Sequence, residues 1–302
     1  MYKFCRVCNL HLWRRVMVMK RSTFLLIHGA WHGAWCYGKV IPFLSKAGHM
    51  AVAIDLPGYG LEAGFPKSYF HRPLDPAVSA TESSPLAAVT LQACADKIIG
   101  TIEGLMEGGS GPVVLVGHSM GGVPITLVGE RVPEKIKKLV YLAAFMPEPD
   151  VPAGAYINAP KNEGEIVSSL IKADPAAVGA IRLDPRSSDP DYRSALKQAF
   201  YEDLSDAELD GVLNFLTPDQ PALIPGTPIK TTQARWGSIK RAYIKCSRDN
   251  AIRPLMQQHF IDKADAFVPQ NRTEVVTLQT SHSPFLADPE GLAKILIRLG
   301  EQ

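Results

Sequence analysis

The sequence predicts an α/β fold, in which a mostly parallel, doubly wound sheet of about six strands carries an inserted helical cap. Short β-branched runs alternate with helical patterns over residues 22–146 and again over 238–302. Between them, residues 147–237 are rich in proline and hold only short amphipathic pieces, which we interpret as the cap. A G-x-S-x-G motif, Gly117 to Gly121, joins an apolar run to a helical pattern. The 302 residues suffice for one large domain with an insertion, or for two modest domains.

The core strands are expected wherever a short apolar run ends in a turn signal. These runs are residues 22–28, 50–55, 112–116, 138–144, 241–246 and 274–278. Helical spacing predicts the connecting helices at about 35–46, 88–107, 123–131, 252–263 and 289–299. Within the cap, 193–201 and 207–215 are amphipathic, and residues 61–86 read as a long surface loop because Pro, Ser, Gly and Ala dominate them.

Bulk composition excludes several classes of partner. The formal charge of +2 gives no reason to expect nucleic acid or an anionic membrane as a partner. No run approaches the ~18 apolar residues of a membrane span. The five cysteines are few, scattered and odd in number, which favours unpaired thiols in a reducing compartment, so we expect a cytoplasmic protein. The oligomeric state is left open, a homodimer included.

The first residues of the chain differ from the rest. Residues 1–21 contain six basic and no acidic side chains, without an apolar run of signal-peptide length, and we interpret them as a disordered extension. Cys5, Cys8 and His11 do not complete a tetrahedral zinc site. We therefore expect neither a metal nor a cofactor.

Ser119 is the candidate nucleophile. A strand, a G-x-S-x-G turn and a helix together form a nucleophile elbow, where the serine occupies a strained turn. Gly117 and Gly121 must be small, because the strand and the helix approach each other closely there. The alternative is a glycine-rich turn that contains a serine by chance.

A serine hydroxyl needs a base and an orienting carboxylate, which in this architecture follow the late strands in the order acid, then histidine. Asp249 stands three residues after the run that ends at Cys246, and His282 stands four residues after Leu278. The predicted catalytic triad is Ser119, Asp249 and His282. Asp249 has an alternative role as the cap of a helix that begins near Ile252.

Two backbone N–H groups should stabilise the oxyanion of the transition state. The residue after the nucleophile, Met120, supplies one donor, and we assign the other to Ala30 in the loop after the first strand. His28 and His32 are expected to orient that loop through side-chain hydrogen bonds. Aromatic and aliphatic side chains of the cap could line an apolar pocket or form the cap core: Phe145, Tyr156, Phe200, Tyr201, Phe215 and Leu216.

Three segments carry a family resemblance. The stretches 28–35 (HGAWHGAW), 117–122 (GHSMGG) and 235–249 (RWGSIKRAYIKCSRD) resemble the branch of the α/β-hydrolase superfamily that holds plant methylesterases and hydroxynitrile lyases. The likeness covers about residues 22–300 and extends to bacterial esterases with a longer loop after the second strand. It implies an α/β-hydrolase fold with a helical cap and carboxylic ester hydrolysis without a cofactor.

Departures from that branch bear on the reaction. The plant lyases carry a lysine directly after the triad histidine and a threonine after the histidine of the oxyanion loop, whereas this chain has Ser283 and Gly29. We therefore favour a serine carboxylesterase. An apolar cap over the site suggests an uncharged, hydrophobic ester, either aromatic or with a medium acyl chain. Lyase chemistry and a non-catalytic small-molecule receptor are the alternatives.

Overall fold

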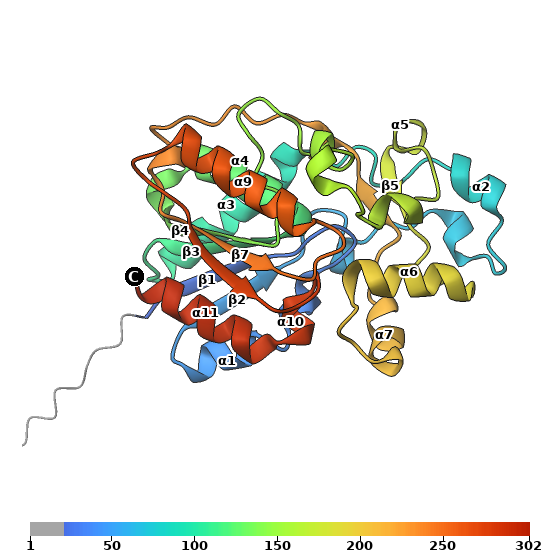
Figure 1. Cartoon of the computed structure of the whole chain (residues 1–302), viewed down its shortest axis with the longest axis horizontal. Helices are drawn as coiled ribbons and strands as arrows, with labels where there is room; N and C mark the ends of the chain where they lie inside the picture. The colour runs from blue at the N-terminus through green and yellow to red at the C-terminus, as the bar shows by residue number, and fades with distance from the viewer. Residues whose placement is uncertain (1–20) are drawn as a thin grey trace, which may run out of the picture.

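A six-stranded parallel sheet forms the centre of the molecule (Figure 1). The computed structural model describes residues 21–302, so the predicted extension, apart from Arg21, lies outside the described residues. The strand order is β2-β1-β3-β4-β7-β8 and every neighbouring pair is parallel. The strands are β1 (Thr23–Ile27), β2 (Met50–Ile54), β3 (Val113–His118), β4 (Ile136–Leu142), β7 (Arg241–Cys246) and β8 (Glu274–Leu278). The predicted doubly wound sheet is thus confirmed.

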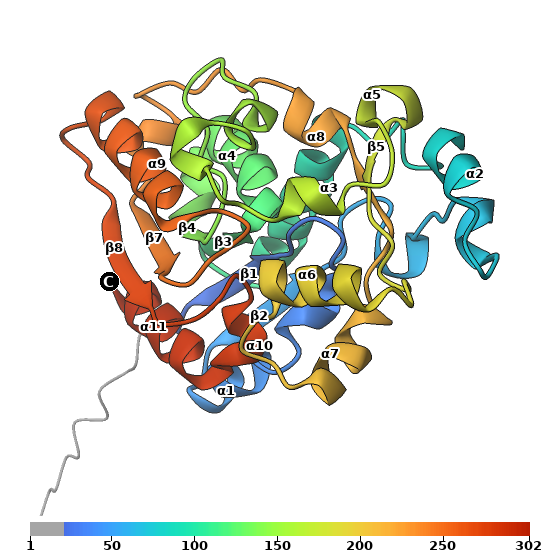
Figure 2. The ribbon, with the colours of Figure 1, turned by 45° about the vertical axis from the view of Figure 1, so that its right-hand side comes forward.

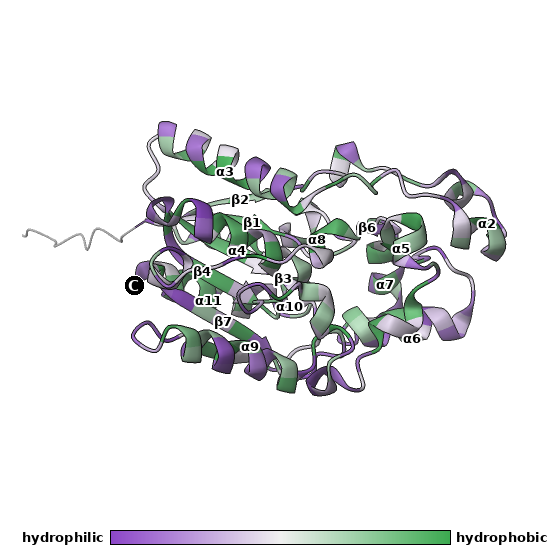
Figure 3. Cartoon of the chain, turned by 90° about the horizontal axis from the view of Figure 1, so that it is seen from above, coloured by the Kyte–Doolittle hydropathy of each residue, from purple (hydrophilic) through white to green (hydrophobic). Residues whose placement is uncertain are grey.

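Helices cover both faces of this sheet. One layer holds α1 (Ile41–Lys46) and α11 (Pro289–Glu301), and the other holds α3 (Leu91–Glu107), α4 (Gly122–Arg131) and α9 (Pro254–Phe267). Figure 3, which looks onto the second layer, shows hydrophilic and hydrophobic residues side by side on α3 and α9. The short α10 (Pro284–Ala287) precedes α11.

Strand β1 shows why the sheet needs two helix layers. Phe24 and Leu26 belong to the apolar cluster beneath α1 and α11, whereas Leu25 and Ile27 belong to the larger cluster on the opposite face. All four side chains are fully buried. Because successive side chains of a strand point to opposite faces, a wholly apolar strand must be covered on both sides.

The first predicted helix is in fact two helices. A 3-10 helix spans Ala34–Tyr37, and α1 begins only at Ile41. Pro42 occupies the first turn of α1, where its missing N–H costs nothing, but inside a continuous helix its ring would clash with the preceding turn.

Residues 147–237 hold four α-helices, two of which overlap the amphipathic pieces expected at 193–201 and 207–215, and the same range holds several 3-10 helices. It also holds a small sheet, which the sequence did not predict. The helices are α5 (Pro175–Val178), α6 (Pro190–Phe200), α7 (Asp206–Leu213) and α8 (Leu223–Gly226). Strands β5 (Ala180–Arg182) and β6 (Asp219–Pro221) pair antiparallel. With three residues each, these strands are too short to show an alternating pattern. Figure 2 shows α5, α6 and α7 beside the sheet.

Residues 61–86 were expected to form a surface loop, and that prediction is wrong in part. The segment contains the 3-10 helix Lys67–Phe70 and α2 (Pro76–Thr81). It is anchored by the buried Arg182, whose Nη1 donates to the carbonyl oxygens of Ser79 and Glu82 at 2.5 and 2.8 Å. Arg182 lies about a hundred residues along the chain from both carbonyl groups, so no local sequence pattern reveals these contacts.

Two further findings concern the part of the chain that the structure describes. No helix within residues 21–302 is long and apolar enough to cross a membrane. The three cysteines of this range, Cys36, Cys94 and Cys246, are free and buried. Burial raises the pKa of the Cys94 thiol to about 12, so this thiol is protonated and unreactive near neutral pH.

Candidate active site

Ser119 occupies a sharp turn between β3 and α4. Its φ of +51° lies in the left-handed region, which side chains other than glycine rarely adopt. A Cβ on Gly117 would lie 2.6 Å from the carbonyl oxygen of Gly121, and a Cβ on Gly121 would lie 2.5 Å from that of His28. The predicted elbow geometry is present, and only glycine fits at these two flanking positions.

The carboxyl ends of β7 and β8 bring Asp249 and His282 together. Nδ1 of His282 donates to Oδ2 of Asp249 across 2.8 Å, and both side chains are almost completely buried. The other carboxylate oxygen, Oδ1, accepts the backbone N–H groups of Ala251 and Ile252, each at 2.8 Å. The alternative role predicted for Asp249 is thus partly realised, although the loop it caps precedes α9, which begins at Pro254.

His118 joins the elbow to the loop that carries His282. Its Nε2 donates to the backbone carbonyl oxygen of His282 at 2.9 Å, and the two ring centroids are 4.7 Å apart. The structure thereby places Ser119 and His282 at the same edge of the sheet. The hydrogen bonds of residues 21–302 do not include one between Ser119 Oγ and His282 Nε2, a contact that active sites often complete only when substrate binds.

The two predicted oxyanion donors flank the serine. Ala30 and Met120 line the same cavity as Ser119. Met120 lies in the first turn of the 3-10 helix Ser119–Gly121, where N–H groups have no acceptor within the helix. A Cβ on Gly29 would lie 2.8 Å from Cβ of Ser119, so the loop after β1 packs directly against the elbow.

His28 holds this loop through two hydrogen bonds. Its Nδ1 donates to the carbonyl oxygen of Gly29 at 2.8 Å, and its Nε2 accepts the backbone N–H of Leu56 at 3.0 Å. Burial lowers the pKa of His28 to about 4, so the ring is neutral at physiological pH.

His32 makes an equivalent pair of contacts. Its Nδ1 donates to the carbonyl oxygen of Ala30 at 2.7 Å, and its Nε2 accepts the hydroxyl of Tyr201 at 2.7 Å. Burial lowers the pKa of His32 to about 3. Both ring nitrogens of each histidine are occupied by these hydrogen bonds, so His28 and His32 orient the loop and have no free nitrogen to act as the general base.

A narrow cavity of about 40 Å³ opens beside Ser119 and is lined largely by apolar side chains. Of the six pocket residues suggested by the sequence, Phe145 and Phe200 line it. Tyr156, Tyr201 and Leu216 are buried outside its lining, and Phe215 is 62% exposed and packs against Trp35. Trp31, for which the sequence suggested a place in the core or the pocket wall, also lines the cavity. The lining residues that sequence reasoning missed are Ile157, Asn162, Glu165, Val167, Ile171, Ile181, Ala251 and Ile252.

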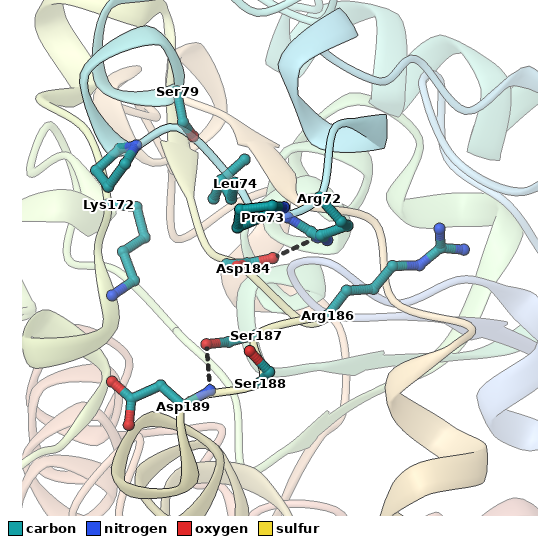
Figure 4. A pocket seen from close by; sticks show the side chains of 11 residues that line it. Arg72, Pro73, Leu74, Ser79, Lys172, Asp184, Arg186, Ser187, Ser188 and Asp189 are labelled. Carbon is teal, nitrogen blue, oxygen red and sulfur yellow. Dashed lines mark hydrogen bonds and ion pairs between the residues drawn. The ribbon is translucent and has the colours of Figure 1, made fainter.

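A larger hollow of about 780 Å³ lies elsewhere, between the 61–86 segment and residues 172–189 (Figure 4). Arg72 and Asp184, which both line it, form an ion pair at 2.8 Å, while the Arg186 side chain extends away from the other labelled side chains. None of the predicted site residues lines this hollow. We therefore assign the candidate active site to the smaller cavity, because Ser119 lines it. His282 lies outside its lining, at the same edge of the sheet, where His118 binds its backbone carbonyl oxygen.

Gln257 in α9 is a polar contributor that sequence reasoning missed. Its side chain is fully buried, and its Nε2 lies 3.1 Å from Oδ2 of Asp249. The available signal was a glutamine on the apolar side of a helix, next to the buried Met256 and three residues before the buried Phe260. No group of three or more His, Cys, Asp or Glu side chains in residues 21–302 could hold a metal ion.

The comparison with known families decides the classification. A model described as "Alpha/beta hydrolase family" matches residues 24–295. The chain belongs to the alpha/beta hydrolase family. The resemblance read from the sequence motifs is thereby confirmed.

Characterised relatives fall in the expected branch. The chain is 27% identical over 289 residues to Methylesterase 9 of Arabidopsis thaliana, covering 92% of this chain and 98% of the relative. It is 28% identical over 243 residues to the Alpha-hydroxynitrile lyase of the same plant, covering 77% and 81%. Among solved structures, the pyrethroid hydrolase PytH shares the fold, with a TM-score of 0.71 and 23% identity over 93% of this chain and 98% of PytH.

Proposed function

We propose that this protein is a serine carboxylesterase, which hydrolyses small uncharged, hydrophobic carboxylic esters through an acyl-enzyme intermediate. The observation that carries the proposal is Ser119, held in a left-handed turn beside an apolar cavity, with the His282–Asp249 pair at the same sheet edge. The names of relatives such as Methylesterase 9 support ester hydrolysis.

The residues suit the two halves of the reaction. As Ser119 Oγ attacks the ester carbonyl carbon, Nε2 of His282 takes the hydroxyl proton, while Asp249 holds Nδ1–H and stabilises the imidazolium. The N–H groups of Ala30 and Met120 donate to the oxyanion. His282 then protonates the departing alcohol, and the acyl group remains bound to Ser119 Oγ as an ester. In the second half, His282 removes a proton from water, the hydroxide attacks this ester, and the carboxylic acid is released with Ser119 regenerated.

The cavity supports an uncharged substrate. Its lining contains no lysine or arginine, and Glu165 is its one ionisable side chain within the described residues. A carboxylate and apolar walls disfavour an anionic substrate, because its charge would lose hydration without a partner. We infer an ester with an aromatic or medium-length acyl group.

The lyase alternative has less support. A cationic group that could hold cyanide is absent from the cavity lining in the described part of the chain. Ser283, which stands where the plant lyases carry lysine, is 2% exposed, and its Oγ has no hydrogen-bond partner among the described residues. A receptor without turnover would not require the buried His282–Asp249 pair.

The test is hydrolysis of p-nitrophenyl esters of increasing acyl length by the wild type and by Ser119→Ala. We expect the substitution to lower kcat by about 10⁴-fold or more, and the chain-length optimum to report the size of the pocket. Ser238→Ala, at an exposed serine, serves as the control and should match the wild type.

Equal inertness of the wild type and Ser119→Ala on every ester would refute the proposal. Cyanohydrin cleavage would then be assayed for lyase activity, and binding of the uncleaved esters would be measured for a receptor. Labelling of the wild type, but not of Ser119→Ala, by a fluorophosphonate would show independently that Ser119 is an activated nucleophile.

A further inference from the structure

We propose that Gln257 is a positioning residue, which fixes the carboxylate of Asp249 so that Oδ2 faces His282. The inference rests on the proposed hydrolytic role of Ser119. It concerns a residue of α9, which the sequence motifs do not include.

The Gln257 amide is completely buried and fully engaged. Its Oε1 accepts the backbone N–H of Cys246 at 3.0 Å. Its Nε2 lies 3.1 Å from the carbonyl oxygen of Cys246, 2.7 Å from that of Ile252 and 3.1 Å from Oδ2 of Asp249. The two N–H bonds of the amide are thus shared among three acceptors.

These partners define one orientation of the amide. If the amide were reversed, Oε1 would face two carbonyl oxygens and a carboxylate, and Nε2 would face the N–H of Cys246. Four unfavourable contacts would replace four favourable ones, because like polar groups cannot hydrogen-bond. Gln257 therefore acts as a fixed donor toward Asp249.

This donor completes the hydrogen bonding of the carboxylate. Oδ1 of Asp249 accepts two backbone N–H groups, from Ala251 and Ile252, and Oδ2 accepts His282 Nδ1 and Gln257 Nε2. A carboxylate has about four lone-pair sites, so each is used once. The same glutamine binds the end of β7 through Cys246, which links the position of Asp249 to the sheet.

The test compares Gln257→Met with Gln258→Met. Gln258 is the next residue of α9, is half-buried and bonds to Lys245 and Asp262, away from the site, so it is a matched control. We expect Gln257→Met to lower kcat by roughly 10- to 100-fold with little change in KM, because the reacting groups lose alignment rather than substrate contacts. Gln258→Met should match the wild type.

The pH profile separates positioning from a merely structural role. Without the Gln257 donor, Oδ2 of Asp249 carries more negative charge toward His282 and favours the imidazolium. The acid limb of kcat/KM should therefore move to higher pH in Gln257→Met and stay in place in Gln258→Met. The low-field proton resonance of His282 Nδ1–H should also shift in Gln257→Met, and this signal requires no turnover.

An unchanged kcat, pH profile and Nδ1–H resonance in a folded Gln257→Met would overturn the inference. If Gln257→Met does not fold, the pH dependence of activity in Gln257→Glu tests the inference instead. An ionised glutamate there would repel Asp249, so its activity should fall as pH rises, and a profile equal to that of the wild type would reject positioning. If wild-type Ser119 is neither labelled by a fluorophosphonate nor active, the proposed function fails, whereas the Nδ1–H resonance still tests Gln257.

Discussion

Nε2 of His118 donates to the backbone carbonyl oxygen of His282 across 2.9 Å. The residue directly before the candidate nucleophile thus holds the loop of the candidate base. Burial keeps the pKa of His118 well below its usual value, so its ring is neutral and donates through Nε2 alone. This contact joins the elbow that carries Ser119 to the loop that carries His282.

We expect His118→Phe to lower kcat/KM by about fivefold, because an aromatic ring is kept at this position and a hydrogen bond worth about 1 kcal/mol is lost. Ester hydrolysis with circular dichroism as a folding check measures the effect. His118→Gln, which retains a side-chain donor, should lose less activity. A folded His118→Phe with wild-type kcat/KM would show that this contact does not set the distance between Ser119 and His282.

Acidification should destabilise the fold through His28 and His32. Their pKa values are about 4 and about 3 in the folded state, below the ordinary 6.5. Below pH 6.5 the unfolded chain binds protons that the folded chain does not, so the free energy of unfolding rises with pH. This contribution is fully present above pH 6.5 and is lost as pH falls toward 4 and 3. At pH 5 the loss is roughly 2 kcal/mol per histidine.

Urea unfolding at pH 7.5 and pH 5 measures this dependence. His32→Gln should reduce the difference between the two pH values, although it lowers stability at pH 7.5 by removing the contact with Tyr201. His71→Gln, at an exposed histidine, should leave the difference as in the wild type. If the difference in the free energy of unfolding between pH 7.5 and pH 5 is the same in all three proteins, His32 does not contribute to the acid destabilisation.

Gly29→Ala should abolish most activity. The added Cβ would lie 2.8 Å from both Cβ of Ser119 and Nδ1 of His118, so the elbow or the loop must shift. A shift of about 1 Å in the position of a reacting group costs about 100-fold in kcat/KM. Gly100→Ala is the control, since its Cβ meets nothing within 4 Å in α3, and alanine should stabilise that helix by up to about 1 kcal/mol. Wild-type kinetics for Gly29→Ala would refute the packing argument.

Phe200→Ala should shift the acyl-length optimum toward longer esters, because Phe200 lines the cavity beside Ser119. Phe215→Ala removes an equal side chain that is 62% exposed and outside the cavity lining, so its optimum should not move. The p-nitrophenyl ester series reports both optima as ratios of kcat/KM. If the acyl-length optimum stays in place in Phe200→Ala, or moves equally in both variants, the acyl group does not bind against Phe200.

Long apolar patterns predicted the core well. The strands that became β1, β3 and β4 are rich in buried Val, Leu and Ile, and their alternation with helices leaves few topologies. The break between Tyr37 and Ile41 and the strands β5 and β6 were missed, because so few residues leave no periodic signal. Roles that depend on contacts between distant residues, such as that of Arg182, were equally hidden.

The sequence by itself determined the parallel sheet, the elbow at Ser119 and the strand-end positions of Asp249 and His282, because periodicity and glycine placement are local properties. Only the tertiary structure decided which side chains line the cavity beside Ser119, and that His118 and Gln257 hold the residues of the site. Those contacts join residues of different strands, helices and loops. Their partners are fixed by packing in three dimensions and not by spacing along the chain.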